Sequence, residues 1–178
     1  DVSPLLTLFC PDCTVKEKDF SLGGARYAYH GIQIVSFPNT INALLNIREI
    51  VYKRKIKSLS DCYNAMCANY VGYEDVLLLI KNQKKQFGKA DEDVIHLTND
   101  LQTFIGNVAD NLTMNGNKVK VGFSSPGYID SAKNIGASFD GRRYGEPFAV
   151  HISPISSDID LFEILDFASS LNYRGNRI

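Results

Sequence analysis

The sequence has no apolar run that approaches the ~20 residues of a membrane-spanning helix. It also lacks a charge excess: 19 Lys and Arg balance 20 Asp and Glu, so the net charge of −1 leaves no basic field for nucleic acid. No signal peptide is visible, and the first residue is Asp1 rather than Met, as in an internal piece or a processed product. We therefore expect a soluble, cytoplasmic protein whose partners include neither a membrane nor nucleic acid.

The chain also lacks a complete set of metal ligands. Cys10 and Cys13 have the C-x-x-C spacing of a zinc knuckle or a redox pair, but Cys62 and Cys67 are spaced wrongly for a second such motif. The three histidines are scattered along the chain. A redox pair has weak support, because such a motif belongs between a strand and a helix. We expect no metal site, and we interpret the cysteines as reduced thiols with structural roles.

What is present is the composition of one ordinary globular domain. The 178 residues are 44% hydrophobic and 22% charged, and no internal repeat or low-complexity linker interrupts them. Residues 31–37 (GIQIVSF) predict a buried strand, and residues 118–123 alternate as a second strand after a turn at Asn115-Gly116. Helices are predicted at 38–55, 58–67, 74–82, 91–108 and 161–171. The order predicts one α/β unit over residues 1–178.

Two of these helices have apolar faces that we expect to be buried. In the helix that Ser58 opens, the apolar face gives both Cys62 and Cys67 a place in the core. Asp91 can cap the long helix that follows it. The side of that helix expected to be buried holds Val94, Leu97, Leu101, Phe104, Ile105 and Val108.

Residues 136–154 (GASFDGRRYGEPFAVHISP) combine a turn, a basic pair and two prolines. Asp140-Gly141 predicts a tight turn, because Gly adopts the positive φ that such a turn needs and Asp can hydrogen-bond its own backbone. Arg142 follows the turn, where we expect it to form an ion pair, and Pro147 excludes a central strand position. The segment is either an elaborate surface turn or a loop built to hold a fixed shape.

Residues 136–154 resemble a segment of the glycyl radical enzymes, the superfamily of pyruvate formate-lyase and glycerol dehydratase. The family pattern is G-[NA]-[TS]-P-D-G-R-[RK]-x-G-x-P-F. Further matches come in the family's order: GGARY at 23–27, GIQ at 31–33, NYVGYED at 69–75 and QFG at 86–88. The resemblance covers nearly the whole chain to about Pro154. It implies that the following residues form a structural motif: Gly136, Asp140, Gly141, Arg142, Gly145 and Pro147.

The resemblance implies an α/β fold, namely part of the C-terminal half of a ten-stranded α/β barrel with surrounding helices. In this family a cysteine inside the barrel takes a hydrogen atom from a small-molecule substrate, and a radical stored on a glycine oxidises that cysteine. The barrel shelters these radicals from solvent. A separate activating enzyme, which uses S-adenosylmethionine and an iron–sulfur cluster, installs the radical. The implied partners are the remainder of the same enzyme, this activating enzyme and a substrate, with a possible homodimer.

Two motifs of the family do not occur in this sequence. The G-C-V-E phrase around the catalytic cysteine is missing, and Cys10 and Cys13 lie in a later stretch of the family pattern, so we do not transfer its role to them. The R-V-x-G-Y motif of the radical glycine is missing too, because the neighbours of Gly175 do not fit it. Phe139 replaces the usual proline. We therefore assign no catalytic residue and no bound cofactor to this chain, and we expect the glycyl radical on a glycine outside it.

Three classes of function remain open. The first is a fragment of a glycyl radical enzyme, an anaerobic radical lyase, dehydratase or acyltransferase that is inactive as this chain alone. The second is a non-catalytic relative or partner subunit with the same half-barrel, which the missing motifs favour. The third is an unrelated binding domain that carries a similar turn.

The predicted strand at 31–37 supplies candidates for a substrate pocket, because barrel strands present alternate side chains to the interior. Ile32, Ile34 and Ser36 would face one way, and Gln33, Val35 and Phe37 the other. The candidates for the pocket are Ile32, Gln33, Ile34, Ser36 and Phe37.

Overall fold

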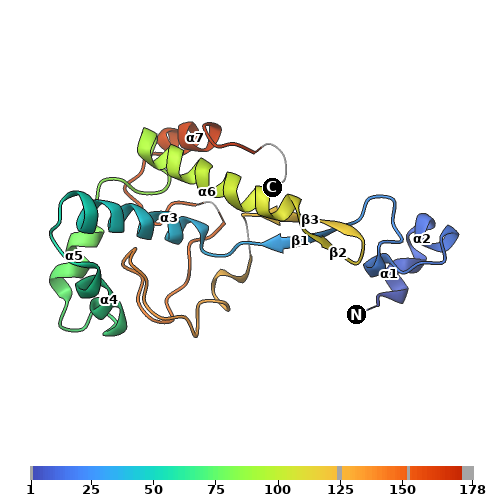
Figure 1. Cartoon of the computed structure of the whole chain (residues 1–178), viewed down its shortest axis with the longest axis horizontal. Helices are drawn as coiled ribbons and strands as arrows, with labels where there is room; N and C mark the ends of the chain where they lie inside the picture. Colours follow the sequence, from blue (N-terminus) through green and yellow to red (C-terminus); the bar gives the residue numbers. More distant parts are fainter. Residues whose placement is uncertain (1, 124–125, 152, 174–178) are drawn as a thin grey trace. The chain divides into compact units, whose positions relative to one another are not determined.

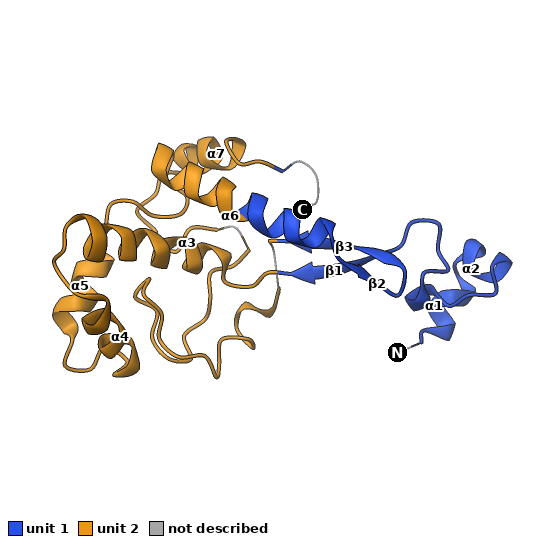
Figure 2. Cartoon of the chain, in the orientation of Figure 1, with its two compact units in different colours: residues 1–33, 102–122, 173–178 blue, residues 34–101, 123–172 orange. Residues whose placement is uncertain are grey.

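The computed structural model describes residues 2–123, 126–151 and 153–173. Their contacts group the chain into two compact units (Figure 2). Unit 1 holds residues 1–33, 102–122 and 173–178, and unit 2 holds residues 34–101 and 123–172. The long helix α6 (Glu92–Asp110) belongs in part to each. The single α/β unit expected over the whole chain stays a prediction.

Unit 1 contains a three-stranded mixed sheet with the order β1-β3-β2 (Figure 1). β1 (Tyr29–Gln33) runs parallel to β3 (Asn117–Gly122), and the short β2 (Thr113–Met114) pairs with β3 in the antiparallel direction. The hairpin turn between β2 and β3 is at Asn115-Gly116, where both residues have positive φ, as predicted. Alternation along β3 buries Val119 and Val121, which confirms the second predicted strand.

The first predicted strand was partly wrong. β1 ends at Gln33, so the alternation of faces does not continue to Phe37. Ser36 has a φ of +66°, which turns the chain, and Phe37 begins helix α3 (Phe37–Asn46) with Pro38 in its first turn. The strand is not buried either: Ile32 is 40% exposed. Among the described residues β3 is the single strand that pairs with β1, so no strand pairs with the other edge of β1.

The N-terminal part of unit 1 is held by one carboxylate. Helices α1 (Pro4–Leu8) and α2 (Pro11–Val15) are followed by a 3₁₀ turn, η1 (Phe20–Leu22). Asp19 accepts hydrogen bonds from the Ser3 N–H at 3.2 Å, the Thr7 hydroxyl at 2.7 Å, and both the hydroxyl and the N–H of Ser21 at 2.6 and 2.8 Å. The bonds from the hydroxyls of Ser21 and Thr7 lower the pKa of Asp19 to about 2.

Unit 2 is mainly helical. α3 continues into a π-helical segment, η2 (Ile47–Lys53), and is followed by α4 (Leu59–Cys67) and α5 (Glu74–Lys81). Ser58 and Asp61 form the capping box of α4 that the sequence predicts. A 3₁₀ turn, η3 (Pro126–Tyr128), precedes the long loop, and α7 (Leu161–Ser169) begins at Asp160, whose carboxylate accepts the N–H of Phe162 at 2.8 Å. The predicted helices are thus confirmed.

Helix faces were predicted less well than helix positions. Phe104 and Val108 of α6 are 65% and 48% exposed, and the residues buried on α6 include Thr98 and Gln102. Thr98 is accommodated because its hydroxyl donates to the carbonyl of Val94 at 2.7 Å. In the part of the chain that the structure describes, every helix is too short or too polar to cross a lipid bilayer.

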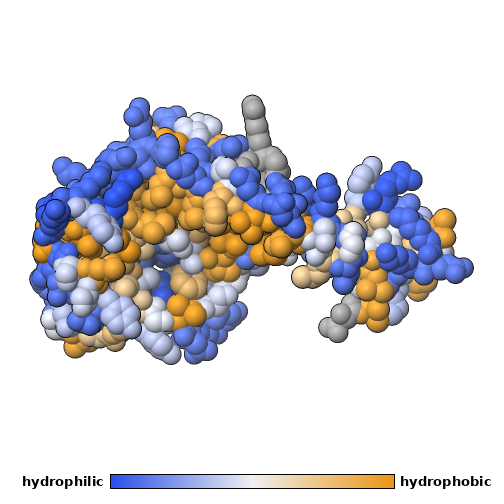
Figure 3. All heavy atoms as spheres, viewed as in Figure 1, coloured by the Kyte–Doolittle hydropathy of each residue, from blue (hydrophilic) through white to orange (hydrophobic). Residues whose placement is uncertain are grey.

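Among its described residues, unit 2 contains two groups of buried apolar side chains that can be named. One group is Ile50, Cys62, Ala65, Tyr70, Val76, Leu77, Ile80 and Phe139. The other contains four packed phenylalanine rings: Phe37, Phe87, Phe123 and Phe167. Cys62 has the core position expected, whereas Cys67 is exposed, contrary to prediction, because α4 packs on the side of Cys62 and Ala65. Both units also expose apolar side chains, among them Phe9 of unit 1 and Phe162 of unit 2. Figure 3 shows apolar residues at the surface of both units.

Candidate functional site

The loop at 136–151 is a fixed structure held by its own turn. The N–H of Gly141 donates to the carbonyl of Ser138 at 3.1 Å, and the N–H of Ser138 donates to the carbonyl of Arg142 at 3.0 Å. Gly141 has a φ of +89°, which an L-residue with a side chain rarely adopts. Asp140 accepts the Ser138 hydroxyl at 2.5 Å and the N–H of Arg142 at 3.4 Å. The Asp140-Gly141 turn is therefore a closed hydrogen-bonded unit.

Arg142 occupies the centre of this loop and is only 5% exposed. Its guanidinium donates to the Ser138 hydroxyl at 3.2 Å and lies over the ring of Phe148, with Cζ 4.6 Å from the ring centroid. It also donates to the carbonyls of Gly136, Arg143 and Glu146. No described carboxylate forms an ion pair with it, so the expected ion pair is replaced by backbone carbonyls. Arg142 thus fixes the path of the loop from the inside.

Three asparagines of α3 connect this helix to distant loops, and sequence analysis missed them. Asn39, Asn42 and Asn46 are all buried, and their spacing of three and four residues puts them on one helix face. Asn39 donates to Asp140 at 2.5 Å and accepts the N–H of Ala149 at 2.8 Å. The available signal was three Asn at helical spacing inside a helix, where Asn is disfavoured unless its amide has a specific partner.

The other two asparagines have similar roles. Asn46 donates to the carbonyl of Phe139 at 2.9 Å, and the Oδ1 of Asn42 accepts the N–H of Phe87 at 2.6 Å. Phe139, which stands in place of the family's proline, is itself inserted in the core and 2% exposed. The Tyr70 hydroxyl donates to the carbonyl of Ser138 at 2.7 Å, and burial, with a contribution from Asp140, raises the pKa of Tyr70. The loop is therefore anchored from several elements of unit 2.

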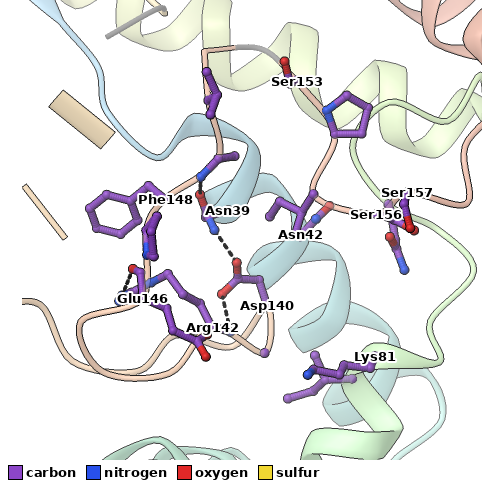
Figure 4. A pocket seen from close by; sticks show the side chains of 18 of the residues that line it. Asn39, Asn42, Lys81, Asp140, Arg142, Glu146, Phe148, Ser153, Ser156 and Ser157 are labelled. Atoms are coloured by element: carbon purple, nitrogen blue, oxygen red, sulfur yellow. Dashed lines mark hydrogen bonds between the residues drawn. The ribbon is translucent and has the colours of Figure 1, made fainter. Parts of the chain in front are cut away.

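A cavity of about 560 Å³ lies beside this loop in unit 2 (Figure 4). Its lining includes polar residues from α3 and the loop, together with Lys81, Gln86 and three serines, and apolar residues such as Pro147 and Phe148. The Oδ1 of Asn42 is engaged by Phe87, and its Nδ2 has no partner in the described part of the chain. Among the described residues that line the cavity there is neither Cys nor His. The cavity can hold a small polar molecule but offers no thiol or imidazole for catalysis.

The pocket candidates from sequence are distributed elsewhere. Ile32 and Gln33 lie on β1 with exposed side chains, Ile34 and Ser36 are half-buried in the following turn, and Phe37 is buried among phenylalanine rings. None of the five lines this cavity, whose lining begins at Asn39. Whether any of them faces a substrate pocket of a complete protein stays a prediction.

The remaining residues of the predicted structural motif are Gly136, Gly145 and Pro147, and they differ in what the backbone requires of them. Gly145 has a φ of +71°, and its N–H donates to the carbonyl of Ile135 at 3.2 Å. A Cβ built on Gly136 would meet nothing within 4 Å, and the carbonyl of Gly136 accepts from Arg142. Pro147 lines the cavity. Gly141 and Gly145 are thus the positions where the backbone itself requires glycine.

The fold, which combines a small mixed sheet with helices and an Asp-Gly-Arg loop, recurs in a known family of proteins. A family model of the pyruvate formate lyase-like proteins matches residues 2–128, and the chain belongs to this family. It is similar to a trans-4-hydroxy-L-proline dehydratase of Clostridioides difficile, with 29% identity over 153 residues. It is also similar to a (2S)-3-sulfopropanediol dehydratase of Klebsiella oxytoca, with 25% identity over 158 residues.

The structural likeness extends over nearly the whole chain. The crystal structure of a glycyl radical enzyme from Archaeoglobus fulgidus superposes with a TM-score of 0.83 and 28% sequence identity, covering 97% of this chain. The coverage of the relatives is small: the alignments span 85% and 87% of this chain but 19% of each dehydratase, and 22% of the Archaeoglobus chain. The chain therefore corresponds to about a fifth of the length of these relatives.

The expectation that the glycyl radical is stored on a glycine outside this chain stays a prediction. The sequence has no R-V-x-G-Y motif, and Gly175 lies outside the described residues. We therefore derive no radical step from this chain.

Proposed function

We propose that this chain is a segment of a glycyl radical enzyme, in which it builds part of the ten-stranded barrel that shelters the radical pair. The observation that carries the proposal is the family match over residues 2–128 together with the superposition on a glycyl radical enzyme at a TM-score of 0.83. The parallel pair β1 and β3 would be neighbouring barrel strands. The edge of β1 that pairs with no described strand, and the exposed apolar residues of both units, would contact the remainder of the enzyme.

The role of this chain's own residues in that enzyme is structural. Asn39, Asp140 and Arg142 hold the 136–151 loop in one conformation, and a fixed loop can exclude water from an adjoining interior. The reaction we propose is dehydration of a small hydroxylated molecule, because the two relatives are dehydratases. The enzyme would act anaerobically in the cytoplasm, require a radical S-adenosylmethionine activating enzyme, and form a homodimer.

A second function is a non-catalytic barrel relative or a partner subunit. The family match and the superposition are compatible with it as well, because both concern the part of the fold that this chain contains. The two functions differ in the complete reading frame, since an enzyme requires a G-C-V-E phrase before these residues and an R-V-x-G-Y motif after them.

Electron paramagnetic resonance of the complete protein tests the proposal. After anaerobic incubation with an activating enzyme, S-adenosylmethionine and a reductant, a glycyl doublet is expected, and it should disappear on exposure to air. The matched control is the same protein with the glycine of the R-V-x-G-Y motif replaced by alanine. A complete reading frame without that motif, or activated protein without the doublet, would overturn the first function and leave the second.

A further inference from the structure

Cys10 and Cys13 lie in the same helical turn. Cys10 is the N-cap of α2, and the N–H of Cys13 donates to the carbonyl of Cys10 at 3.0 Å. A hydrogen bond between residues i and i+3 belongs to a turn in which the two Cα atoms are within ~7 Å of each other. Disulfides join Cα atoms that are ~4.4–6.8 Å apart. The backbone therefore already holds the two cysteines near the separation of a disulfide.

The two thiols differ in their exposure to solvent. Cys13 is 1% exposed, whereas Cys10 is only half-buried. Burial raises the pKa of the Cys13 thiol, and a side-chain hydrogen bond with Cys10 raises it further. An incoming reagent would therefore meet Cys10 first, and Cys13 lies where it can react next.

Gly24 makes room for this pair. A Cβ built on Gly24 would lie 2.8 Å from the Sγ of Cys13 and 2.0 Å from the carbonyl oxygen of Lys18. The N–H of Lys18 donates to the carbonyl of Cys13 at 3.0 Å, and the N–H of Gly24 donates to the carbonyl of Asp19 at 3.0 Å. The Sγ of Cys13 is thus packed closely against the backbone at Gly24.

We propose that Cys10 and Cys13 form a reversible thiol–disulfide site whose co-reactant is a small-molecule disulfide of the glutathione type. The Cys10 thiolate attacks one sulfur of the co-reactant, a Cys10–glutathione bond forms, and one glutathione thiolate leaves. The Cys13 thiolate then attacks the Sγ of Cys10 and releases the second glutathione. Both cysteines are oxidised, the co-reactant is reduced to two thiols, and the two cysteine protons pass to the released thiolates.

The other two cysteines provide internal controls. Cys62 is 1% exposed in the core, and Cys67 is exposed five residues further along α4. The side chain of Cys67 is a neighbour of the Tyr63 hydroxyl, so its surroundings differ from those of Cys10. Cys67 has no second cysteine in the following turn of the chain. It can therefore form a mixed disulfide with glutathione, but no neighbouring thiol follows it to release the glutathione.

The test uses the complete protein in buffers of increasing oxidised-to-reduced glutathione ratio, followed by alkylation and peptide mass spectrometry. We expect an intact peptide that contains Cys10 and Cys13 and is lighter by two hydrogen atoms, and we expect reduced glutathione to reverse it. In Cys13→Ser, Cys10 should retain one glutathionyl group; in Cys10→Ser, Cys13 should stay free. Cys67→Ser should behave like the wild type.

Alkylatable Cys10 and Cys13 at the highest ratio in the wild type would overturn the proposal. So would a disulfide from Cys10 to a cysteine other than Cys13, or glutathionylation of Cys13 in the Cys10→Ser variant. The measurement on the wild type tests whether the Cys10–Cys13 disulfide forms, even if one of the variants fails to fold. It needs no radical and no activating enzyme, so its outcome is independent of the proposed function.

Discussion

Asn39 donates a 2.5 Å hydrogen bond to the carboxylate of Asp140 across 101 residues of sequence. The same side chain accepts the N–H of Ala149 at 2.8 Å, so one amide joins helix α3 to both halves of the loop at 136–151. Asn39 is 5% exposed, which makes each of these bonds costly to lose. The loop is therefore a part of the helical core of unit 2.

Replacing Asn39 by Ala should destabilise the complete protein by about 2–3 kcal/mol, because Asp140 and the N–H of Ala149 would both lose a buried partner. Chemical denaturation measures the change. Asn64→Ala is the control, since Asn64 is exposed on α4 and no described group bonds its side chain. Equal stability of the two variants would contradict the anchoring role.

Gly141→Ala should destabilise by about 1–2 kcal/mol, because its φ of +89° is costly for an L-residue with a side chain. The new Cβ would also lie 3.4 Å from both Ile80 and Leu77. Gly136→Ala is a matched control in the same loop, where a Cβ would meet nothing within 4 Å. We expect thermal unfolding to separate the two variants, and a neutral Gly141→Ala would show that the turn can adopt another conformation.

Arg142→Lys keeps the charge but should cost about 2 kcal/mol or more. A lysine ammonium lacks the planar fork that reaches several carbonyls and the Ser138 hydroxyl together. Arg143→Lys is the control, because Arg143 is exposed and its side chain has no described partner. The denaturation midpoint of Arg142→Lys should be clearly lower than that of Arg143→Lys. An unchanged midpoint in Arg142→Lys would mean that a positive charge alone is sufficient to hold the loop.

Asp19 should make the N-terminal part of unit 1 sensitive to acid. Its pKa is lowered from 3.8 to about 2, so its stabilising effect is complete above pH 3.8 and is lost as the pH falls through about 2. The difference in stability between the wild type and Asp19→Asn should therefore shrink over this interval. Hydrogen exchange of residues 3–21 at each pH measures it. Glu17→Gln, an exposed neighbour, should show no such change, and a constant Asp19→Asn difference would refute the assignment.

Much of the secondary structure could be predicted because its signals are local. Ser58 and Asp61 cap α4, Asp160 caps α7, and Asn115-Gly116 turns the hairpin, each through contacts within a few residues. The end of β1 was not predictable in the same way. Residues 34–37 have strand composition, but Ser36 at a φ of +66° turns the chain into α3.

The sequence by itself determined the family, through DGRR and the ordered motifs before it, and it determined where most helices begin. The tertiary structure alone decided the partners of the anchors: Asn39, Asn46 and Arg142 bond to groups that no local pattern specifies, and Phe139 enters the core. It also decided which face of α6 is buried. The physical reason is that periodicity and caps act within a helical turn, whereas these choices depend on which distant groups pack against each face. Asn39 and Asp140 satisfy each other only once the fold brings them together.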